Sequence, residues 1–121
     1  MADLSYPTAL AGTLAVEVGL YASLLPRLVP AGTSLTAGRA AVVGVLVNVV
    51  SHPLLWFVLQ PALDRTGATT VVVVLVAESA VWLLEAGLVR ALTPVRWPPA
   101  LAVAALANLV SLAVGLALGA P

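Results

Sequence analysis

Hydrophobic residues run almost without a break through four stretches of the chain, and polar residues gather in the short segments between them. A transmembrane α-helix needs about 20 mostly apolar residues, because the hydrocarbon core is about 30 Å thick and each helical residue advances about 1.5 Å. Each stretch is close to this length. The pattern therefore predicts an all-α polytopic membrane protein with four transmembrane helices, at residues 8–25, 39–60, 68–89 and 100–119.

Proline, glycine and charged residues mark the ends of the predicted helices. Pro26 closes the first and Pro61 the second, because proline cannot continue a regular helix. The valines at 71–74 have strand propensity. An open strand in lipid would leave backbone N–H and C=O groups unpaired, so we expect a helix there as well.

The composition indicates that the membrane helices make up nearly the whole chain. It has 121 residues, of which 62% are hydrophobic and 8% are charged. Soluble domains carry about 25% charged residues. We therefore expect a single transmembrane domain over residues 1–121, with the lipid bilayer as its surroundings. A net charge of zero gives no indication of nucleic-acid binding, and the lack of cysteine excludes thiol chemistry and cysteine-ligated metals.

The positions of the five basic residues predict the topology. Arg27 and Arg39 flank the first connection, Arg90 and Arg96 lie at the third, and only Arg65 lies in the second. Connections rich in arginine and lysine stay on the cytoplasmic side. We therefore expect both termini outside and a multi-pass location in a bacterial inner (plasma) membrane.

A short polar motif occurs twice. Asn48 and Asn108 are the only asparagines, and each has a serine three positions later, Ser51 and Ser111. Residues three apart share one face of a helix. The two motifs are therefore expected at equivalent positions of two repeated units; the alternative is a coincidental match, because an apolar background aligns easily with itself.

The glutamates extend this repeat. Glu17 precedes Asn48 by 31 positions, and Glu78 precedes Asn108 by 30. An aromatic residue follows each of these glutamates by four positions, Tyr21 in the first unit and Trp82 in the second. The predicted units are two tandem helical hairpins, at residues 8–60 and 68–119. A hairpin returns the chain to its starting side, so both copies should have the same orientation, unlike inverted repeats.

Polar residues near the middle of the predicted helices are the candidate site. A charged side chain at the bilayer centre costs roughly 2.5–3.5 kcal/mol on insertion scales, so such residues indicate function or pairing. We expect the polar groups to turn inward together and to bind a ligand or ion. The candidates are Glu17, Glu78, Asn48, Ser51, His52, Asn108 and Ser111.

Three further residues are secondary candidates. Glu85 lies seven positions after Glu78, and we expect a structural role for it, with its carboxyl group reaching water or Arg90 near the cytoplasmic turn. Tyr21 and Trp82 are expected mainly to pack between helices.

His52 precedes a proline inside the second predicted helix, where Pro53 should produce a kink. This histidine is expected either to bond within the kinked helix or to join a proton relay with the glutamates. One histidine without cysteine is a weak metal signal, so no metal site is predicted. The chain has neither a Ser-His-acid arrangement with a nucleophile turn nor an HExxH motif. We expect no enzyme activity, no catalytic residue and no cofactor.

Two functions remain open at this point. In the first, the polar cluster binds or conducts a proton, a cation or a small polar solute. In the second, the chain is a non-catalytic structural or assembly subunit, and its polar groups join helices at about 0.6 kcal/mol for each hydrogen bond. A chain with four short helices encloses little space, so a homo-oligomer or a larger membrane-protein partner is expected in either case.

These elements resemble known membrane proteins. Glu17, Glu78, Glu85 and the Asn-x-x-Ser motifs, the first followed by His52 and Pro53, resemble a family of small four-span bacterial integral membrane proteins of unassigned function. That resemblance implies the fold and the membrane location, and no activity. The segment LAVEVGLYASLL is similar to the first helix of small multidrug resistance transporters, whose membrane glutamate also has a neighbouring valine. The repeated motif and the arginine bias depart from that second pattern.

Overall fold

The computed structural model describes residues 5–119, and this part of the chain is helical without any strand. Four continuous helical segments are long and apolar enough to cross a membrane, with 22, 28, 23 and 22 residues. The prediction of an all-α protein with four such helices is confirmed. The ends of the expected domain, residues 1–4 and 120–121, lie outside the described residues. The elements are α1 (Tyr6–Leu24), the 3-10 turn η1 (Leu25–Arg27), α2 (Ala37–Leu54), the π-helix η2 (Leu55–Leu59), α3 (Gln60–Asp64), α4 (Thr70–Leu92) and α5 (Trp97–Gly119).

Hydroxyl side chains fix where the first three spanning helices begin. The first backbone N–H groups of a helix have no partner within the helix, and a serine or threonine oxygen can accept from one of them. Ser5, Thr36 and Thr69 each accept a hydrogen bond from the backbone N–H three positions later. The polar segments between the apolar stretches therefore start the helices as well as separate them.

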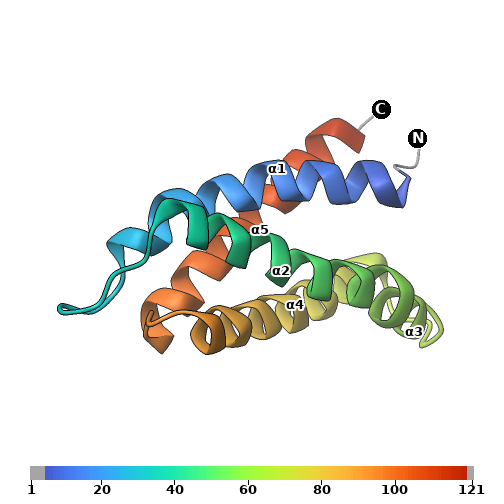
Figure 1. The fold of residues 1–121 in the computed structure, drawn as a ribbon. Coiled ribbons are helices and arrows are strands. Elements are labelled where there is room, and N and C mark those ends of the chain that lie inside the picture. Colours follow the sequence, from blue (N-terminus) through green and yellow to red (C-terminus); the bar gives the residue numbers. More distant parts are fainter. Residues whose placement is uncertain (1–4, 120–121) are drawn as a thin grey trace.

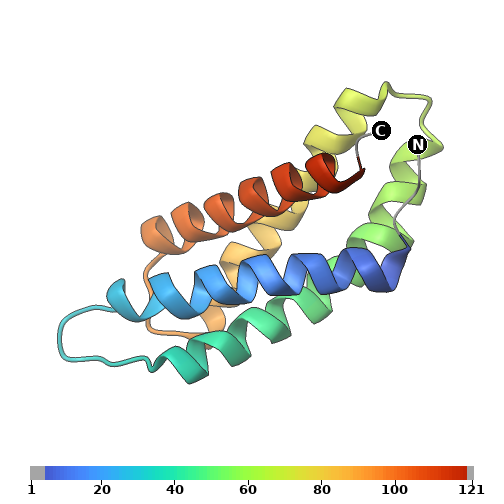
Figure 2. The same ribbon diagram turned by 90° about the horizontal axis from the view of Figure 1, so that it is seen from above.

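The second spanning segment is longer than predicted, because Pro61 does not end it. Pro53 lies inside α2 and has no N–H to bond the Val49 carbonyl. The next five residues, Leu55–Leu59, form a π-helix, and α3 follows with Pro61 in its first turn, where a missing N–H costs little. Figure 2 shows the chain turning away from the axis of α2 along this green segment.

The four spanning helices form a ring. α1 packs on α2 and α5, and α4 packs on α2 and α5, so α1 and α4 face each other across the bundle. The start of α1, the end of α5 and the connection from α3 to α4 lie at one end of the molecule, and the other two connections lie at the opposite end (Figure 1). That opposite end carries Arg27, Arg39, Arg90 and Arg96, all exposed.

A packed apolar core fills the half of the bundle near these arginines. Tyr21 and Leu25 from α1 and η1 pack with Val47 of α2, and Val89 and Val103 bring in the other two helices. The approach of α1 to α2 depends on Gly44, where an added Cβ would lie 3.0 Å from Cδ2 of Tyr21. The polar residues lie in the other half of the bundle.

Candidate functional site

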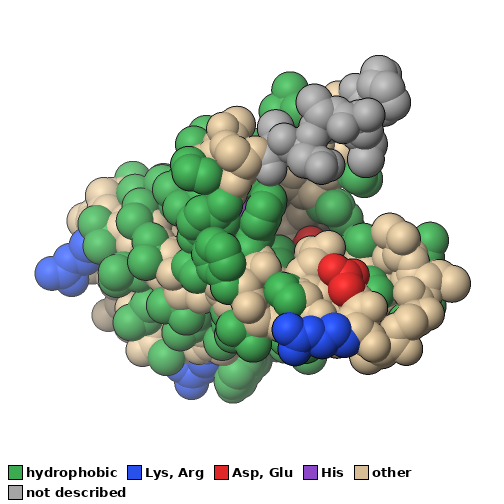
Figure 3. Space-filling view, turned by 90° about the vertical axis from the view of Figure 1, so that its right-hand side faces the viewer, with side chains coloured by type: hydrophobic (Ala, Val, Ile, Leu, Met, Phe, Trp, Pro, Cys, Tyr) green, Lys and Arg blue, Asp and Glu red, His purple; other side chains and the backbone are tan. Residues whose placement is uncertain are grey.

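A cavity of about 270 Å³ lies between the four spanning helices in the half of the bundle away from the arginines. Its walls come from the first part of α1, the second half of α2 with η2 and the start of α3, α4 as far as Glu85, and the second half of α5. Figure 3 shows the molecule from this end, with a hollow in which acidic atoms are visible in red. The polar residues that line the cavity are Thr13, Glu17, Asn48, Ser51, His52, Gln60, Glu78, Glu85, Asn108 and Ser111.

All seven candidate residues from the sequence therefore line one cavity, together with Glu85. The periodicity explains this arrangement, because Asn48 and Ser51 share one face of α2, as do Asn108 and Ser111 on α5. Thr13 was not among the candidates. It lies four positions before Glu17 on the same face of α1, and its hydroxyl lies 3.3 Å from that of Ser111.

Glu85 is the most connected polar side chain in the cavity, and the expectation that it would reach water or Arg90 is wrong. It is only 1% exposed. Its Oε1 accepts a hydrogen bond from Ser51 Oγ at 2.6 Å, and its Oε2 accepts from Asn108 Nδ2 at 2.6 Å and from Tyr21 Oη at 3.2 Å. Glu85 therefore lies on the inner side of α4, and its three donors come from the other three spanning helices.

Glu17 differs sharply from Glu85, because one of its oxygens has no partner. The residue is 2% exposed, and among the described residues Oε2 finds no hydrogen-bond donor. The nearby amide of Asn48 donates to the carbonyl of Gly44 at 2.9 Å. Burying a carboxyl oxygen without a donor costs free energy, so Glu17 offers an unused acceptor to whatever enters the cavity.

His52 is the second buried polar group with an unused atom. It is 7% exposed, and its Nε2 has no hydrogen-bond partner in residues 5–119. Its ring packs against Tyr6, with centroids 5.5 Å apart, and against Trp56 at 6.0 Å. The expected bond within the kinked helix is therefore not found at Nε2, and packing between aromatic rings holds the imidazole in place.

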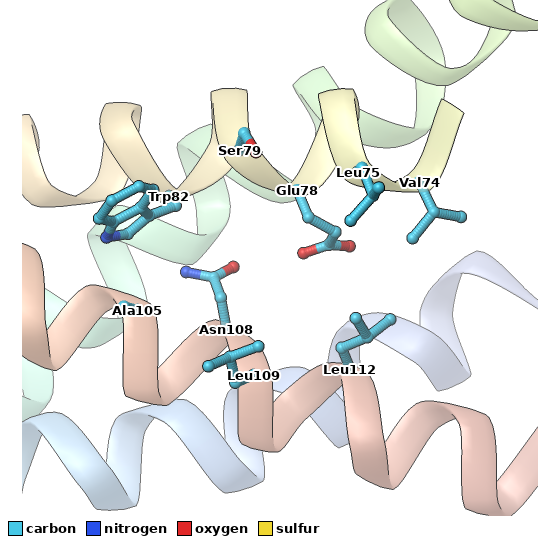
Figure 4. A pocket seen from close by; sticks show the side chains of 9 residues that line it. All are labelled: Val74, Leu75, Glu78, Ser79, Trp82, Ala105, Asn108, Leu109 and Leu112. Carbon is cyan, nitrogen blue, oxygen red and sulfur yellow. The ribbon is translucent and has the colours of Figure 1, made fainter. Parts of the chain in front are cut away.

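Glu78 lies at the border between the cavity and a second hollow. This apolar groove of about 290 Å³ runs between α4 and α5, and Glu78 and Asn108 line it as well as the cavity. In Figure 4 both side chains extend into the space between the two helices. Trp82 closes off one part of the groove and donates from Nε1 to the Leu101 carbonyl at 2.8 Å, so its expected packing role includes a hydrogen bond.

The two predicted repeat units agree in part of their detail. Asn48 donates to the carbonyl four residues before it, and Asn108 does the same, at 2.9 and 2.8 Å. The glutamates are less alike, because Glu17 is buried and Glu78 is only half-buried. Glu85 has no acidic counterpart, since the matching position in the first unit is Leu24.

Carboxyl, amide and hydroxyl side chains, together with His52, make up the polar part of the cavity wall. Among residues 5–119, no group of three histidine, aspartate or glutamate side chains is placed to hold a metal. Three glutamates line the cavity, and no arginine lines it. The site offers carboxyl, hydroxyl and amide groups, and two buried atoms without partners.

Comparison with known protein families, curated proteins and solved structures finds no match for this chain. The class of protein is therefore defined by the fold itself. Four helices able to span a membrane make it a multi-pass membrane protein. The resemblance to small four-span bacterial proteins stays a prediction.

Proposed function

We propose that this protein binds a small organic cation with hydrogen-bond donors, a protonated amine, in its central cavity, as the binding step of transport across the inner membrane. The observation that carries this proposal is the unpartnered Oε2 of Glu17, a carboxyl oxygen buried beside a cavity. An ionised carboxylate in the membrane interior is costly unless a positive charge and hydrogen-bond donors accompany it. An ammonium group supplies both.

The size of the cavity supports a small solute. A water molecule occupies about 30 Å³ of liquid volume, so a cavity of about 270 Å³ holds an amine of a few heavy atoms together with some water. A calcium ion would require six to eight oxygen ligands at about 2.3–2.6 Å, and among residues 5–119 no three acidic or histidine side chains converge to begin such a set.

The position of the packed core supports access from one side only. Apolar residues such as Leu25, Val47 and Val89 fill the end near the arginines, whereas the cavity extends toward the opposite end. The arginine distribution predicts that this opposite end faces outward. The ligand would then enter from outside, and transport would require the core end to open.

Binding of ethanolammonium to the purified full-length protein tests the proposal. Isothermal titration in detergent would compare ethanolammonium with ethylene glycol, which has similar size and no charge. We expect ethanolammonium to bind and ethylene glycol not to bind. Loss of a desolvated charge pair costs about 2–5 kcal/mol, so Glu17→Gln should weaken ethanolammonium binding by tenfold or more.

The matched control is Asp64→Asn, which makes the same change of charge at an exposed carboxylate at the end of α3. It should bind ethanolammonium as the wild type does. Equal binding of the two ligands, or equal loss in the two variants, would contradict the proposal.

A structural role is the second candidate, because the Glu85 carboxyl group is fully used by protein donors. In that case the polar cluster joins the helices and needs no ligand. Glu17→Gln would then leave every ligand measurement unchanged, and stability alone would respond to changes in the cluster.

A further inference from the structure

The groove between α4 and α5 is an unexplained feature of the outer surface. Its walls are almost entirely apolar, and two of its leucines, Leu75 and Leu109, are 62% and 65% exposed. In a membrane these side chains face the acyl chains of lipid. The groove therefore opens sideways into the bilayer, whereas the central cavity extends along the bundle.

One carboxyl group, that of Glu78, interrupts the apolar lining. Glu78 is half-buried, and no hydrogen bond to it is found in residues 5–119. A carboxyl group that faces acyl chains without a partner is costly. A ligand with a positively charged group at Glu78 and a hydrocarbon chain against the leucines would complement both parts of this groove.

The groove and the cavity share one wall. Val74, Glu78, Asn108 and Leu112 line both. A single molecule can therefore place its charged end in the cavity and its apolar part in the groove, because the two spaces adjoin. Trp82, bonded to the Leu101 carbonyl, limits the groove at one end, so an apolar chain would extend past Leu75 and Leu112 (Figure 4).

From these contacts we infer that the α4–α5 groove binds the hydrocarbon chain of an amphiphilic primary amine, whose ammonium group lies at Glu78 and in the acidic cavity. This inference rests on the proposed function and narrows its ligand class, from any small amine to one with an aliphatic tail. The aliphatic tail would lie on the bilayer side of the bundle, while the ammonium group occupies the cavity that extends toward the outer end. The carboxyl group of Glu78 favours the amine over the acyl chain of an ordinary lipid, because it can pair with an ammonium group.

Photolabelling of the full-length protein in liposomes tests the inference. The probe is a ten-carbon primary amine with a diazirine at the far end of its chain, and the matched probe is the corresponding alcohol. We expect the amine to label groove residues such as Leu75, Ser79 and Leu109 at least fivefold more than the alcohol does. Glu78→Gln should reduce this labelling to the level of the alcohol.

Two tryptophan variants separate the groove from the rest of the lipid-facing surface. Leu109→Trp fills the groove and should reduce amine labelling at least fivefold. Leu83→Trp changes a leucine on α4 that is also exposed, at 56%, and does not line the groove. That variant should be labelled like the wild type. Ethanolammonium binding by Leu109→Trp would show that the variant is folded and that the cavity is intact.

Other occupants would give different results. Equal labelling by amine and alcohol would assign the groove to lipid acyl chains and overturn the inference. Because the chain has no cysteine, Ser79→Cys introduces a unique thiol, and its oxidation to a disulfide dimer at high yield would show that a second copy covers the groove. In either outcome, ethanolammonium binding would still support the proposed function. Loss of ethanolammonium binding would contradict both the proposed function and this inference.

Discussion

The Tyr21 hydroxyl on α1 donates a hydrogen bond to Oε2 of Glu85 on α4 at 3.2 Å, between helices that face each other across the bundle. Ser51 of α2 and Asn108 of α5 donate to the same carboxyl group. One side chain from each spanning helix therefore meets at this point. It lies where the packed core ends and the cavity begins, since Tyr21 belongs to the core and Glu85 lines the cavity.

Glu85→Leu should strongly destabilise the protein. It leaves the three donors of Tyr21, Ser51 and Asn108 without their acceptor in a buried place, and each unsatisfied group costs about 1–3 kcal/mol. Glu85→Gln keeps one acceptor oxygen and should cost less. Unfolding in a mixed detergent series would measure both changes, and a Glu85→Leu protein as stable as the wild type would contradict the assigned role.

Gly44→Ala should disturb the same junction from the side of α2. The added Cβ would lie 3.0 Å from Cδ2 of Tyr21 and 3.3 Å from Cα of Val18, so the two helices must separate slightly. Overpacking of this kind typically costs about 1–3 kcal/mol. Gly12→Ala is the matched control, because an added Cβ there meets nothing within 4 Å. Equal stability of the two variants in the unfolding assay would show that this close approach is unimportant.

Glu17→Gln should separate function from stability. The Oε2 atom of Glu17 has no donor, so removing its charge takes away no protein hydrogen bond at that atom. Residues kept for binding are often unfavourable for stability. We expect the free energy of unfolding to stay within about 0.5 kcal/mol or to rise, while ethanolammonium binding falls tenfold or more. A large loss of stability would show that Glu17, like Glu85, has a structural role.

Accessibility to a thiol reagent should follow the boundary between cavity and core. In intact cells, a cationic reagent that cannot cross membranes should modify Thr13→Cys, which replaces a residue that lines the cavity. It should not modify Val47→Cys, which replaces a fully buried core residue. Ethanolammonium should slow the first reaction. Modification of Thr13→Cys only after the membrane is opened would contradict the predicted orientation with both termini outside.

The spanning helices could be predicted from the sequence because their signal is long and simple. An apolar stretch of about 20 residues has few other solutions in a bilayer. The prediction was wrong where local chemistry decides the boundary. Pro61 was expected to end the second span, but a proline in the first turn of α3 is compatible with a continuous helix. The π-helix at Leu55–Leu59 could not be predicted, because the spacing of apolar residues does not distinguish it from an α-helix.

The site could be predicted only as a set of inward-facing residues. Periodicity placed Asn48, Ser51, Asn108 and Ser111 on inner faces, and the structure brings them to one cavity. The role of Glu85 could not be predicted, because it depends on which residues of the other three helices lie opposite. The same holds for the α4–α5 groove, which exists only through the packing of two helices.

The most direct test of the account is the distance from a bound ammonium nitrogen to the Glu17 carboxyl carbon. Solid-state NMR can measure it in liposomes, with ¹⁵N-ethanolammonium and protein labelled with ¹³C at glutamate, and Glu17→Gln would assign the signal. Charge-assisted hydrogen bonds join nitrogen and oxygen at about 2.7–2.9 Å, so a nitrogen-to-carbon distance of about 3–4 Å is the predicted result. An ammonium that shows no coupling to Glu17, while the protein is folded and the ligand is in excess, would contradict the account.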